Sequence, residues 1–559
     1  MAHITSHHSG TDETHDTFVV VFKVHGEAIQ LWSNDKMQSI GTTQSFRISC
    51  HNVETHSEHP GSDIQVFVLS EQAPVLENCS FQYQKPKGQL INPLDLATFM
   101  TDPVPKCKKA SYAFDVGISG YGASTDDNHF GDLDEDTYEE LGTAYVYMDP
   151  KFSSQGVQRT PIISSRTRRP IGQMQVEYLI VTNPVAFGSD TPKPEWMFKY
   201  SKLHAGHRGA GSGRRMDLPD GLLENTVASF NYAHRHGADM CELDVLVSAD
   251  GVPVVYHDFD VDAVAAQQSS DELGKFRVQV NEFTVKQMRD FRLLALHDGE
   301  GCPYTLNVPN QAESNKPFPT LAEVLDQVDE SCGLNVEIKW PQLLENGKME
   351  ARKYREINDF VDRIISVINK HAGKRRIVVE SFDADLVIML RLKQDRFPVV
   401  FLSQGLTDRY ERYVDMRARS VTNGIYFAQA FNLAGIDLIL DYYMISGKKL
   451  VEFINNHNLV ARAWGDIGEG NKTLNFLAGI NLQCITYDKI DLVKQLDDEN
   501  EMSEEARQQK QQYQDEQKNS ESSHQQQQLS VTHQQQDHSS TMDGRSEFLE
   551  NQQHGTLVA

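Results

Sequence analysis

The feature that most constrains the fold is an alternation of short apolar runs and helical patterns across residues 200–495. The apolar runs expected to be strands are MCELDVLVS, PVVYHD, LNVEIKW, RRIVVESF, PVVFLSQG, GIYFAQA, LVARAWG and QCITYD. Helical patterns lie between several of them, as in EARKYREINDFVDRIISVINKHAG and DADLVIMLRLKQ. Strand–helix alternation of this length predicts an α/β protein with a (β/α)8 TIM barrel, and a doubly wound open sheet is the alternative.

Other segments of the chain lack this alternation of strand and helix patterns. A polar and irregular stretch at about residues 259–318 is interpreted as an insertion in the barrel. Ahead of the barrel, residues 17–196 are short β-rich runs separated by polar or Gly/Pro segments, which predict a sandwich-like region or two small β modules. The acidic stretch 124–140 lacks the glycine and glutamate of a calcium-binding EF-hand loop, so we interpret it as a solvated loop.

Both ends of the chain are polar. Residues 1–16 are rich in His and Ser, and residues 498–559 are rich in Gln, Ser, His and acidic side chains. Such segments carry too little apolar surface to form a core, so both ends are predicted to be disordered.

Charge and composition limit the classes of partner and the kinds of structure that the chain can have. The formal net charge of −26 argues against binding nucleic acid through general electrostatic attraction, and an anionic substrate would need a locally positive pocket. No apolar run approaches the about 20 residues of a membrane-spanning helix, so no membrane span is predicted. Seven scattered cysteines without a CxxC pair favour neither a disulfide framework nor a zinc ribbon. Because the first residues also lack an apolar signal core, the predicted location is the cytoplasm.

Reactive side chains of a TIM barrel lie at the carboxyl ends of its strands, so the strand ends carry the candidates. The polar or aromatic residues expected there are His207, Arg208, Glu242, Asp244, His257, Glu337, Lys339, Glu380, Ser381 and Trp464. Side chains two apart on a strand share a face, so Glu242 lies beside Asp244 and Glu337 beside Lys339. Burying this many polar groups at one barrel mouth would be energetically unfavourable, which favours a functional role for them.

The carboxylates Glu242, Asp244 and Glu337 are hard oxygen ligands, which suit a divalent cation such as Mg²⁺ or Ca²⁺.

The remaining charged candidates suit a phosphate. Arg208 and Lys339 offer positive charge to a phosphate group, and His207 and His257 can act as acid and base near neutral pH. A divalent cation, a phosphate clamp and two histidines together suggest cleavage of a phosphodiester.

The stretch GAGSGRR at residues 209–215 resembles a dinucleotide-binding loop at a glance. That fingerprint would need its third glycine at position 214, which is Arg, so the nucleotide interpretation is weak. The two arginines either meet a substrate phosphate or face solvent. The following run LLENTVASFNYAHRHG predicts a helix with Asn225 or Thr226 as its N-cap and Gly237 at its end.

Several motifs follow one another in the order seen in glycerophosphodiester phosphodiesterases. They are HRGAG, ENTVASF, ELDVLVSADGVPVVYHD, FPTLAEVL, NVEIKW and ESFDADL. The chain resembles this family over residues 203–490. Two further runs, GKRRIVVESFDAD and RRPIGQMQVEYLIV, look most like the eukaryotic glycerophosphocholine phosphodiesterase branch, in which a starch-binding-like module is joined to the barrel.

The resemblance implies a TIM barrel that uses a divalent cation to hydrolyse glycerophosphodiesters, above all glycerophosphocholine, to glycerol 3-phosphate and an alcohol. In the family's route the neighbouring glycerol hydroxyl attacks phosphorus, and water opens the resulting cyclic phosphate. The implied roles are acid and base for His207 and His257, phosphate binding for Arg208 and Lys339, and metal binding for Glu242, Asp244 and Glu337. From their strand-end positions, and not from the resemblance, Glu380, Ser381 and Trp464 are expected to make further substrate contacts.

Part of the resemblance stays open. Trp32 is the only tryptophan in residues 17–100, so the N-terminal region is expected to be a partial or diverged starch-binding-like module, with a glycan as a candidate partner. Two other functions are alternatives: phosphodiesterase action on another headgroup or on a lysophospholipid, and an interaction scaffold in addition to catalysis.

Overall fold

The residues that the computed structural model describes are 16–33, 36–39, 45–54, 64–70, 79–119, 138–185, 193, 195–218, 221–264, 275–290, 292–294, 312–352, 354–468 and 470–492. Residues 1–15, most of the acidic stretch 124–140 and the Gln-rich tail lie outside these ranges. The predictions made for them stay predictions.

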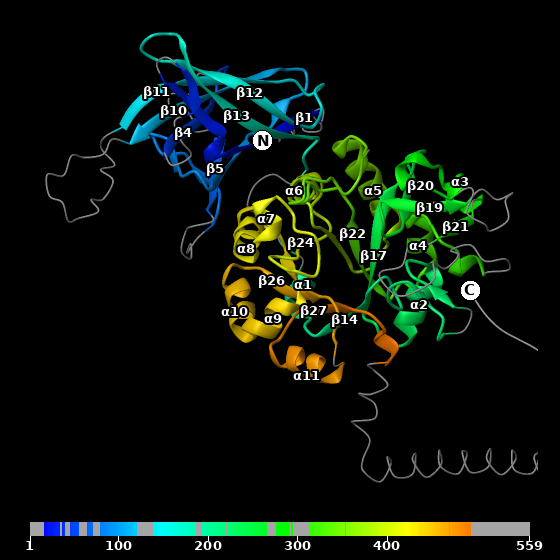
Figure 1. The fold of residues 1–559 in the computed structure, drawn as a ribbon. Coiled ribbons are helices and arrows are strands. Elements are labelled where there is room, and N and C mark those ends of the chain that lie inside the picture. The colour runs from blue at the N-terminus through cyan, green and yellow to red at the C-terminus, as the bar shows by residue number, and fades with distance from the viewer. Residues whose placement is uncertain are drawn as a thin grey trace, which may run out of the picture. The chain divides into compact units, whose positions relative to one another are not determined.

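Eight parallel strands close into a barrel (Figure 1). They are β14 (Leu203–Gly206), β17 (Met240–Val247), β22 (Gly333–Ile338), β23 (Ile377–Ser381), β24 (Val399–Ser403), β25 (Gly435–Ile439), β26 (Val460–Trp464) and β27 (Cys484–Tyr487). Their order is β14-β27-β26-β25-β24-β23-β22-β17, and β14 also pairs with β17. This last pairing closes the sheet, so the predicted TIM barrel is confirmed and the open sheet is excluded.

Helices alternate with these strands. The longer ones are α2 (Val227–Arg235), α4 (Leu321–Gln327), α5 (Ile357–His371), α6 (Ala384–Lys393), α8 (Val421–Ala430), α9 (Leu440–Ser446), α10 (Lys448–Asn456) and α11 (Asn471–Gly479), and the shorter ones are α1 (Glu195–Lys199), α3 (Val285–Asp290) and α7 (Met416–Arg419). In α5, Phe360, Ile364 and Ile368 recur at helical spacing and are buried, so this helix packs one face against its neighbours. Of the helices described, none is long and apolar enough to cross a membrane.

The structure corrects three element predictions. GIYFAQA lies in α8, where the cap residue Ser420 accepts a hydrogen bond from Asn423 N, and the barrel strand is instead the later β25. Both segments are buried apolar runs, which do not by themselves distinguish strand from helix. Within PVVYHD, β18 (Pro253–Val255) pairs antiparallel with β17 and is not one of the barrel strands. The helix expected from residue 350 begins only at Ile357, because the Glu356 side chain caps it.

The barrel interior is filled in layers. An apolar layer at the amino ends of the strands includes Leu203, Met240, Val378, Val400 and Val460, with Met197 of α1 packed against them. The mid-strand layer contains the polar residues Asn335, Glu380, Asp437 and Arg462, each at most 1% exposed. The apolar floor leaves the carboxyl ends of the strands as the place for a ligand, as in other TIM barrels.

The strands before the barrel form one antiparallel sheet. They are β1 (Thr17–His25), β2 (Ile29–Ser33), β3 (Lys36–Ser39), β4 (Phe46–Asn52), β5 (Ile64–Ser70), β6 (Gln82–Tyr83), β7 (Gln89–Ile91), β8 (Asp95–Thr101), β9 (Val104–Pro105), β10 (Ala110–Ser119), β11 (Tyr138–Met148), β12 (Gln155–Ser164) and β13 (Pro170–Thr182). One core, which includes Phe22 and Phe114, lies within the sheet. Gln84 Nε2 donates to the backbone oxygens of Cys50 and Ile64, on strands from opposite ends of the sheet order. The sheet therefore curls around this core.

The segment interpreted as an insertion is more regular than expected where the structure describes it. It contains a small antiparallel sheet of β19 (Asp260–Val264), β20 (Lys275–Gln279) and β21 (Arg292–Leu294), together with α3. Its buried residues Val261, Phe283 and Met288 cluster with Leu246 of β17. These apolar contacts anchor the segment to the barrel.

Candidate active site at the carboxyl ends of the barrel strands

Three carboxylates meet on the neighbouring strands β17 and β22. Glu242 and Asp244 alternate along β17, and Glu337 pairs with Asp244 in the strand register. One carboxylate oxygen from each residue lies within 4.8 Å of the others. Glu242 and Asp244 are buried, and Glu337 is partly buried. The expected shared face therefore exists, and it is completed by the neighbouring strand.

This cluster is electrostatically costly by itself. Burial, followed by the charges of Asp244 and Glu337, raises the pKa of Glu242 well above its usual range. Glu242 Oε1 is buried and accepts no hydrogen bond from the part of the chain that the structure describes. Buried like charges with an unsatisfied oxygen need a compensating cation. Because all the donors are carboxylate oxygens, the residues present fit a hard divalent cation.

Arg208 lies beside this cluster in the first loop of the barrel. Its backbone N–H donates to Glu242 Oε2 at 2.9 Å, and its φ of 48° is in the left-handed region. Its Nη1 donates to Glu224 at 3.1 and 3.2 Å, and its Nε lies 3.7 Å from Asp244 Oδ2. The guanidinium is thus held between Glu224 and the carboxylate cluster. Sequence reasoning missed Glu224, which also accepts a hydrogen bond from Gly213 N.

Lys339 directly follows β22 and also contacts the cluster. Its Nζ lies 2.9 Å from Glu337 Oε1 and 3.7 Å from Asp244 Oδ1. Burial opposes its charge, but Glu337 and Asp244 outweigh burial and raise the pKa of Lys339. Burial would also raise the pKa of Asp244, whereas His257, Lys339 and Arg208 hold that pKa at about 2. Lys339 therefore stays an ammonium and Asp244 a carboxylate at neutral pH.

Both candidate histidines have Nδ1 beside a carboxylate. His257 Nδ1 lies 2.6 Å from Oδ1 of the adjacent Asp258. His207 Nδ1 lies 2.8 Å from Oδ1 of Asp488, and its Nε2 lies 4.0 Å from Glu242 Oε2. Burial, followed by the charges of Arg208 and Lys339, lowers the pKa of His257 well below its usual value. His257 is therefore neutral at physiological pH. Asp488 was not among the sequence candidates.

The loop before α2 supports the site. Thr226 is the N-cap of α2 and accepts from Ser229 N at 3.2 Å, which settles the alternative between the two cap candidates. Asn225 instead donates from Nδ2 to Asp244 Oδ2 at 2.8 Å. Gly237 follows the end of the helix with a φ of 103°, as its expected position there requires. One loop thus supplies both the helix cap and a hydrogen bond to the carboxylate cluster.

The glycine-rich loop packs tightly against α2. Gly209 has a φ of 88°, and a Cβ at this position would lie 2.5 Å from Ser229 Oγ. Arg215 on β15 (Arg214–Arg215) is buried, and its Nη1 lies 3.1 Å from Asp491 Oδ1. Its charge is used in that internal ion pair. Arg214 donates from Nε to the carbonyl of Gly221 on the way to β16 (Leu222–Leu223).

The other three candidates take different positions. Glu380 points into the mid-strand layer, 3.9 Å from Arg462, and burial raises its pKa to about 8. Ser381 is buried, and its hydroxyl donates to Ile338 O at 2.8 Å. Trp464, at the end of β26, is partly exposed and packs its ring 5.4 Å from that of Phe382. The structure therefore places only Trp464 of these three at the open rim.

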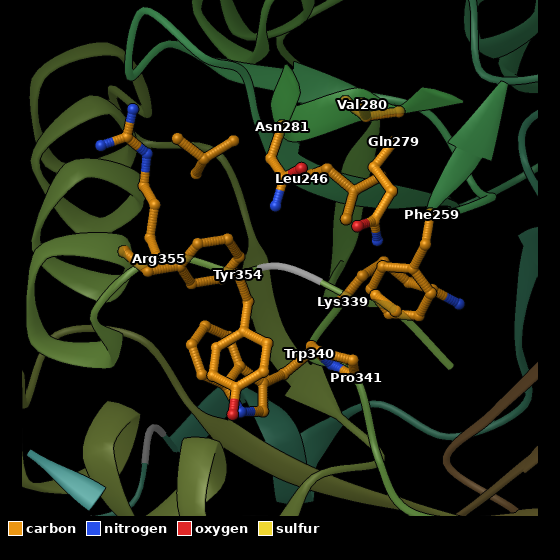
Figure 2. A pocket seen from close by; sticks show the side chains of 13 residues that line it. Leu246, Phe259, Gln279, Val280, Asn281, Lys339, Trp340, Pro341, Tyr354 and Arg355 are labelled. Atoms are coloured by element: carbon orange, nitrogen blue, oxygen red, sulfur yellow. The ribbon is translucent and has the colours of Figure 1, made fainter. Parts of the chain in front are cut away.

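A pocket open to solvent is lined in part by Lys339. Figure 2 shows Trp340 next to Tyr354, with Gln279 and Asn281 of the insertion above them. Most of its lining is apolar or aromatic. The insertion thus contributes a wall next to the candidate phosphate-binding lysine, which the sequence pattern did not indicate.

Comparison with known proteins supports the resemblance. The glycerophosphocholine phosphodiesterase GPCPD1 of Homo sapiens is 33% identical over 347 residues, covering 60% of this chain and 51% of that protein. The glycerophosphocholine phosphodiesterase gde1 of Schizosaccharomyces pombe is 35% identical over 261 residues, covering 41% of this chain and 23% of that protein. The chain therefore spans about half the length of the human relative.

A solved phosphodiesterase from Oleispira antarctica, in complex with the product sn-glycerol-3-phosphate, superposes with a TM-score of 0.38 and 15% identity, covering 54% of this chain and 99% of that one. The model of the glycerophosphoryl diester phosphodiesterase family matches residues 207–492, about half of the chain, and this span includes every candidate site residue. The chain therefore belongs to the glycerophosphoryl diester phosphodiesterase family.

Proposed function

We propose that the protein hydrolyses glycerophosphodiesters, with glycerophosphocholine as the preferred substrate and glycerol 3-phosphate and choline as products. The observation that carries this proposal is the single rim on which three carboxylates, two imidazoles and two cationic side chains converge. The names of the human and fission yeast relatives support the choline headgroup.

The phosphate is assigned to Arg208 and Lys339. Both cations are largely buried, and each lies 3.7 Å from a different carboxylate oxygen of Asp244. Their carboxylate partners hold them in place, so little ordering of long side chains is needed when the substrate binds. A phosphate entering between them would meet two charged donors in a site with little water.

Glu242, Asp244 and Glu337 would hold the divalent cation, Mg²⁺ or Ca²⁺. When bound, that cation supplies positive charge that stabilises the phosphate oxygens as negative charge develops on them. Both metals bind carboxylate oxygens, so each fits this donor set.

The two histidines are assigned the proton transfers. His257 is neutral because its pKa is lowered, so it would accept the proton of the attacking glycerol hydroxyl. That oxygen forms a new bond to phosphorus while the bond to the choline oxygen breaks, and His207 would give a proton to the departing oxygen. Water then opens the cyclic phosphate with the two roles reversed, so both histidines return to their starting states.

The choline headgroup is assigned to an aromatic cluster at the rim. The Trp464 ring centroid lies 5.4 Å from that of Phe382 and 5.8 Å from that of Tyr410. Tyr410 is exposed and Trp464 partly so. Aromatic faces attract quaternary ammonium groups, so this cluster suits choline better than a neutral alcohol.

A cytoplasmic location also belongs to the proposal. It is supported by the cysteines, since none of those the structure describes forms a disulfide. A glycan partner for the β-rich region stays a prediction from the sequence resemblance.

A substrate panel tests the proposal. Purified protein with Mg²⁺ or Ca²⁺ is given glycerophosphocholine, glycerophosphoethanolamine and lysophosphatidylcholine, and choline, ethanolamine and glycerol 3-phosphate are measured. We expect the highest kcat/KM for glycerophosphocholine. No turnover of any diester would refute the proposal, and a preference for lysophosphatidylcholine would favour lysophospholipase D activity instead.

A further inference from the structure

Asp488 connects the last strand of the barrel to the first histidine of the site. It directly follows β27, and its Oδ1 lies 2.8 Å from His207 Nδ1. The same oxygen accepts hydrogen bonds from Ser212 N at 2.9 Å and Ser212 Oγ at 3.2 Å. The two partners are 281 positions apart in the chain, so this contact exists only because the barrel closes.

The backbone of the first loop packs closely against the chain at the end of β27. His207 N donates to Tyr487 O at 3.0 Å, which fixes the start of the loop against the end of β27. Gly211 has a φ of 121°, and a Cβ there would lie 3.2 Å from Lys489 N and 3.5 Å from Asp488 Oδ1. The loop therefore crosses Asp488 at a distance that leaves little room for a side chain.

The carboxylate of Asp488 keeps its charge in this position. Burial would raise its pKa, but the charge of His207 and hydrogen bonds from His207 and Ser212 N outweigh burial and lower it. A charged carboxylate can only accept hydrogen bonds. A neutral His207 ring beside it is therefore stabilised in the tautomer that carries its proton on Nδ1.

We propose that Asp488 is a positioning residue that holds His207 with Nδ1–H toward the carboxylate and Nε2 toward the carboxylate cluster. In this orientation Nε2 faces Glu242, and the two side chains are 4.0 Å apart at His207 Nε2 and Glu242 Oε2. Nε2 carries the lone pair when the ring is neutral and the exchangeable proton when the ring is charged. Asp258 stands in the same relation to His257, through its own Nδ1 contact at 2.6 Å. The proposal rests on the proposed function for the reaction that His207 serves, but the orientation of the ring is a separate claim.

A second link between the same two segments offers a matched control. Arg215 Nη1 and Nη2 each donate to a different oxygen of Asp491 at 3.1 Å, so Asp491 also ties the first loop to the chain after β27. Within the described residues, Asp491 makes no hydrogen bond to His207, and its carboxylate accepts hydrogen bonds from Arg215 and Tyr232. If Asp488 only linked the first loop to the chain after β27, D488N and D491N should change kcat and the unfolding temperature in the same way.

The kinetic arm compares these two variants with wild type. We expect D488N to lower kcat for glycerophosphocholine by at least about 10-fold, since partners that orient metal-ligating histidines contribute about 10- to 100-fold, with KM changed by less than about threefold. We expect D491N to lower the unfolding temperature while leaving kcat close to wild type. Equal loss of kcat in both variants, or an unchanged kcat in D488N, would overturn the proposal.

The spectroscopic arm needs no turnover. Protein labelled with ¹⁵N-histidine is compared as wild type and D488N, and the His207 signals are assigned by their loss in H207Q. The neutral wild-type ring should show a protonated Nδ1 and an unprotonated Nε2, and this preference should weaken in D488N. A wild-type ring protonated on Nε2 would overturn the proposal even if D488N failed to fold. If the tautomer is as expected but no diester is cleaved, the proposed function fails and the orientation by Asp488 stands.

Discussion

Asn225 holds Asp244 through two hydrogen bonds: its Nδ2 donates to Asp244 Oδ2 at 2.8 Å, and its Oδ1 accepts from Asp244 N at 3.3 Å. Asn225 has a φ of 55°, a conformation that asparagine tolerates better than most residues. The next residue, Thr226, caps α2. The turn into α2 therefore fixes one of the three carboxylates of the candidate metal site.

Removing the Asn225 side chain should weaken cation binding. N225A leaves Asp244 free to rotate, and we expect the affinity for Ca²⁺ or Mg²⁺ to fall by about 10- to 100-fold, as for other residues that orient metal ligands. Isothermal titration calorimetry measures this affinity directly. T226A is the neighbouring control: it should cost about 1 kcal/mol of stability through loss of the cap while leaving the affinity unchanged. Equal affinity losses in both variants would contradict the assignment.

Trp464 should contribute to headgroup selection. If choline rests on its ring, W464A should raise KM for glycerophosphocholine by about fivefold, the equivalent of about 1 kcal/mol of cation–π attraction. KM for glycerophosphoglycerol, whose headgroup is neutral, should change less. W464F keeps an aromatic face and should retain most of the preference. If W464A raised KM equally for both substrates, Trp464 would not recognise the positive charge of the choline headgroup.

Glu380 should make the stability of the folded protein depend on pH. Burial raises its pKa from 4.5 to about 8, so between these values the folded state binds more protons than the unfolded state. Stability from this group therefore falls as pH rises through that window. E380Q mimics the protonated form at every pH, so the gain in unfolding temperature over wild type should be larger at pH 8 than at pH 5. Differential scanning calorimetry at both values measures it.

The control for this prediction is Glu27, which is exposed in the β-rich region. E27Q should shift the unfolding temperature little, and by the same amount at both pH values. An E380Q difference that stays constant between pH 5 and pH 8 would contradict the raised pKa of Glu380.

The parts of the site that could be predicted from sequence depend on local periodicity. The alternation of Glu242 and Asp244 along one strand, and the position of Glu337 at the end of another, are sufficient to place their carboxylates on the barrel mouth. The same logic failed for β25, because GIDLI and the nearby GIYFAQA are both apolar and buried. Only the cap at Ser420 and the packing of the closed barrel decide which of the two is the strand.

Residues that act through tertiary contact were beyond the reach of sequence patterns. Asp488 meets His207 across 281 positions, and Glu224 meets Arg208 through a loop whose path is set by glycines. A lone Asp after a strand carries no local signal for such a role. Conversely, Ser381 lies at the end of a barrel strand, where a substrate contact is expected. Its hydroxyl instead donates to Ile338 O, and its position in the sequence does not predict this hydrogen bond.

The central claim is that Glu242, Asp244 and Glu337 hold a divalent cation without which the rim does not cleave a phosphodiester. The most direct measurement follows choline release from glycerophosphocholine by wild-type protein before chelation, after chelation with EDTA, and after restoring Mg²⁺ or Ca²⁺, with E242Q measured alongside. We predict that chelation abolishes release, that one of the two metals restores it, and that E242Q stays inactive under all conditions with its fold intact by circular dichroism. Full release in EDTA, or wild-type release by E242Q, would contradict the claim.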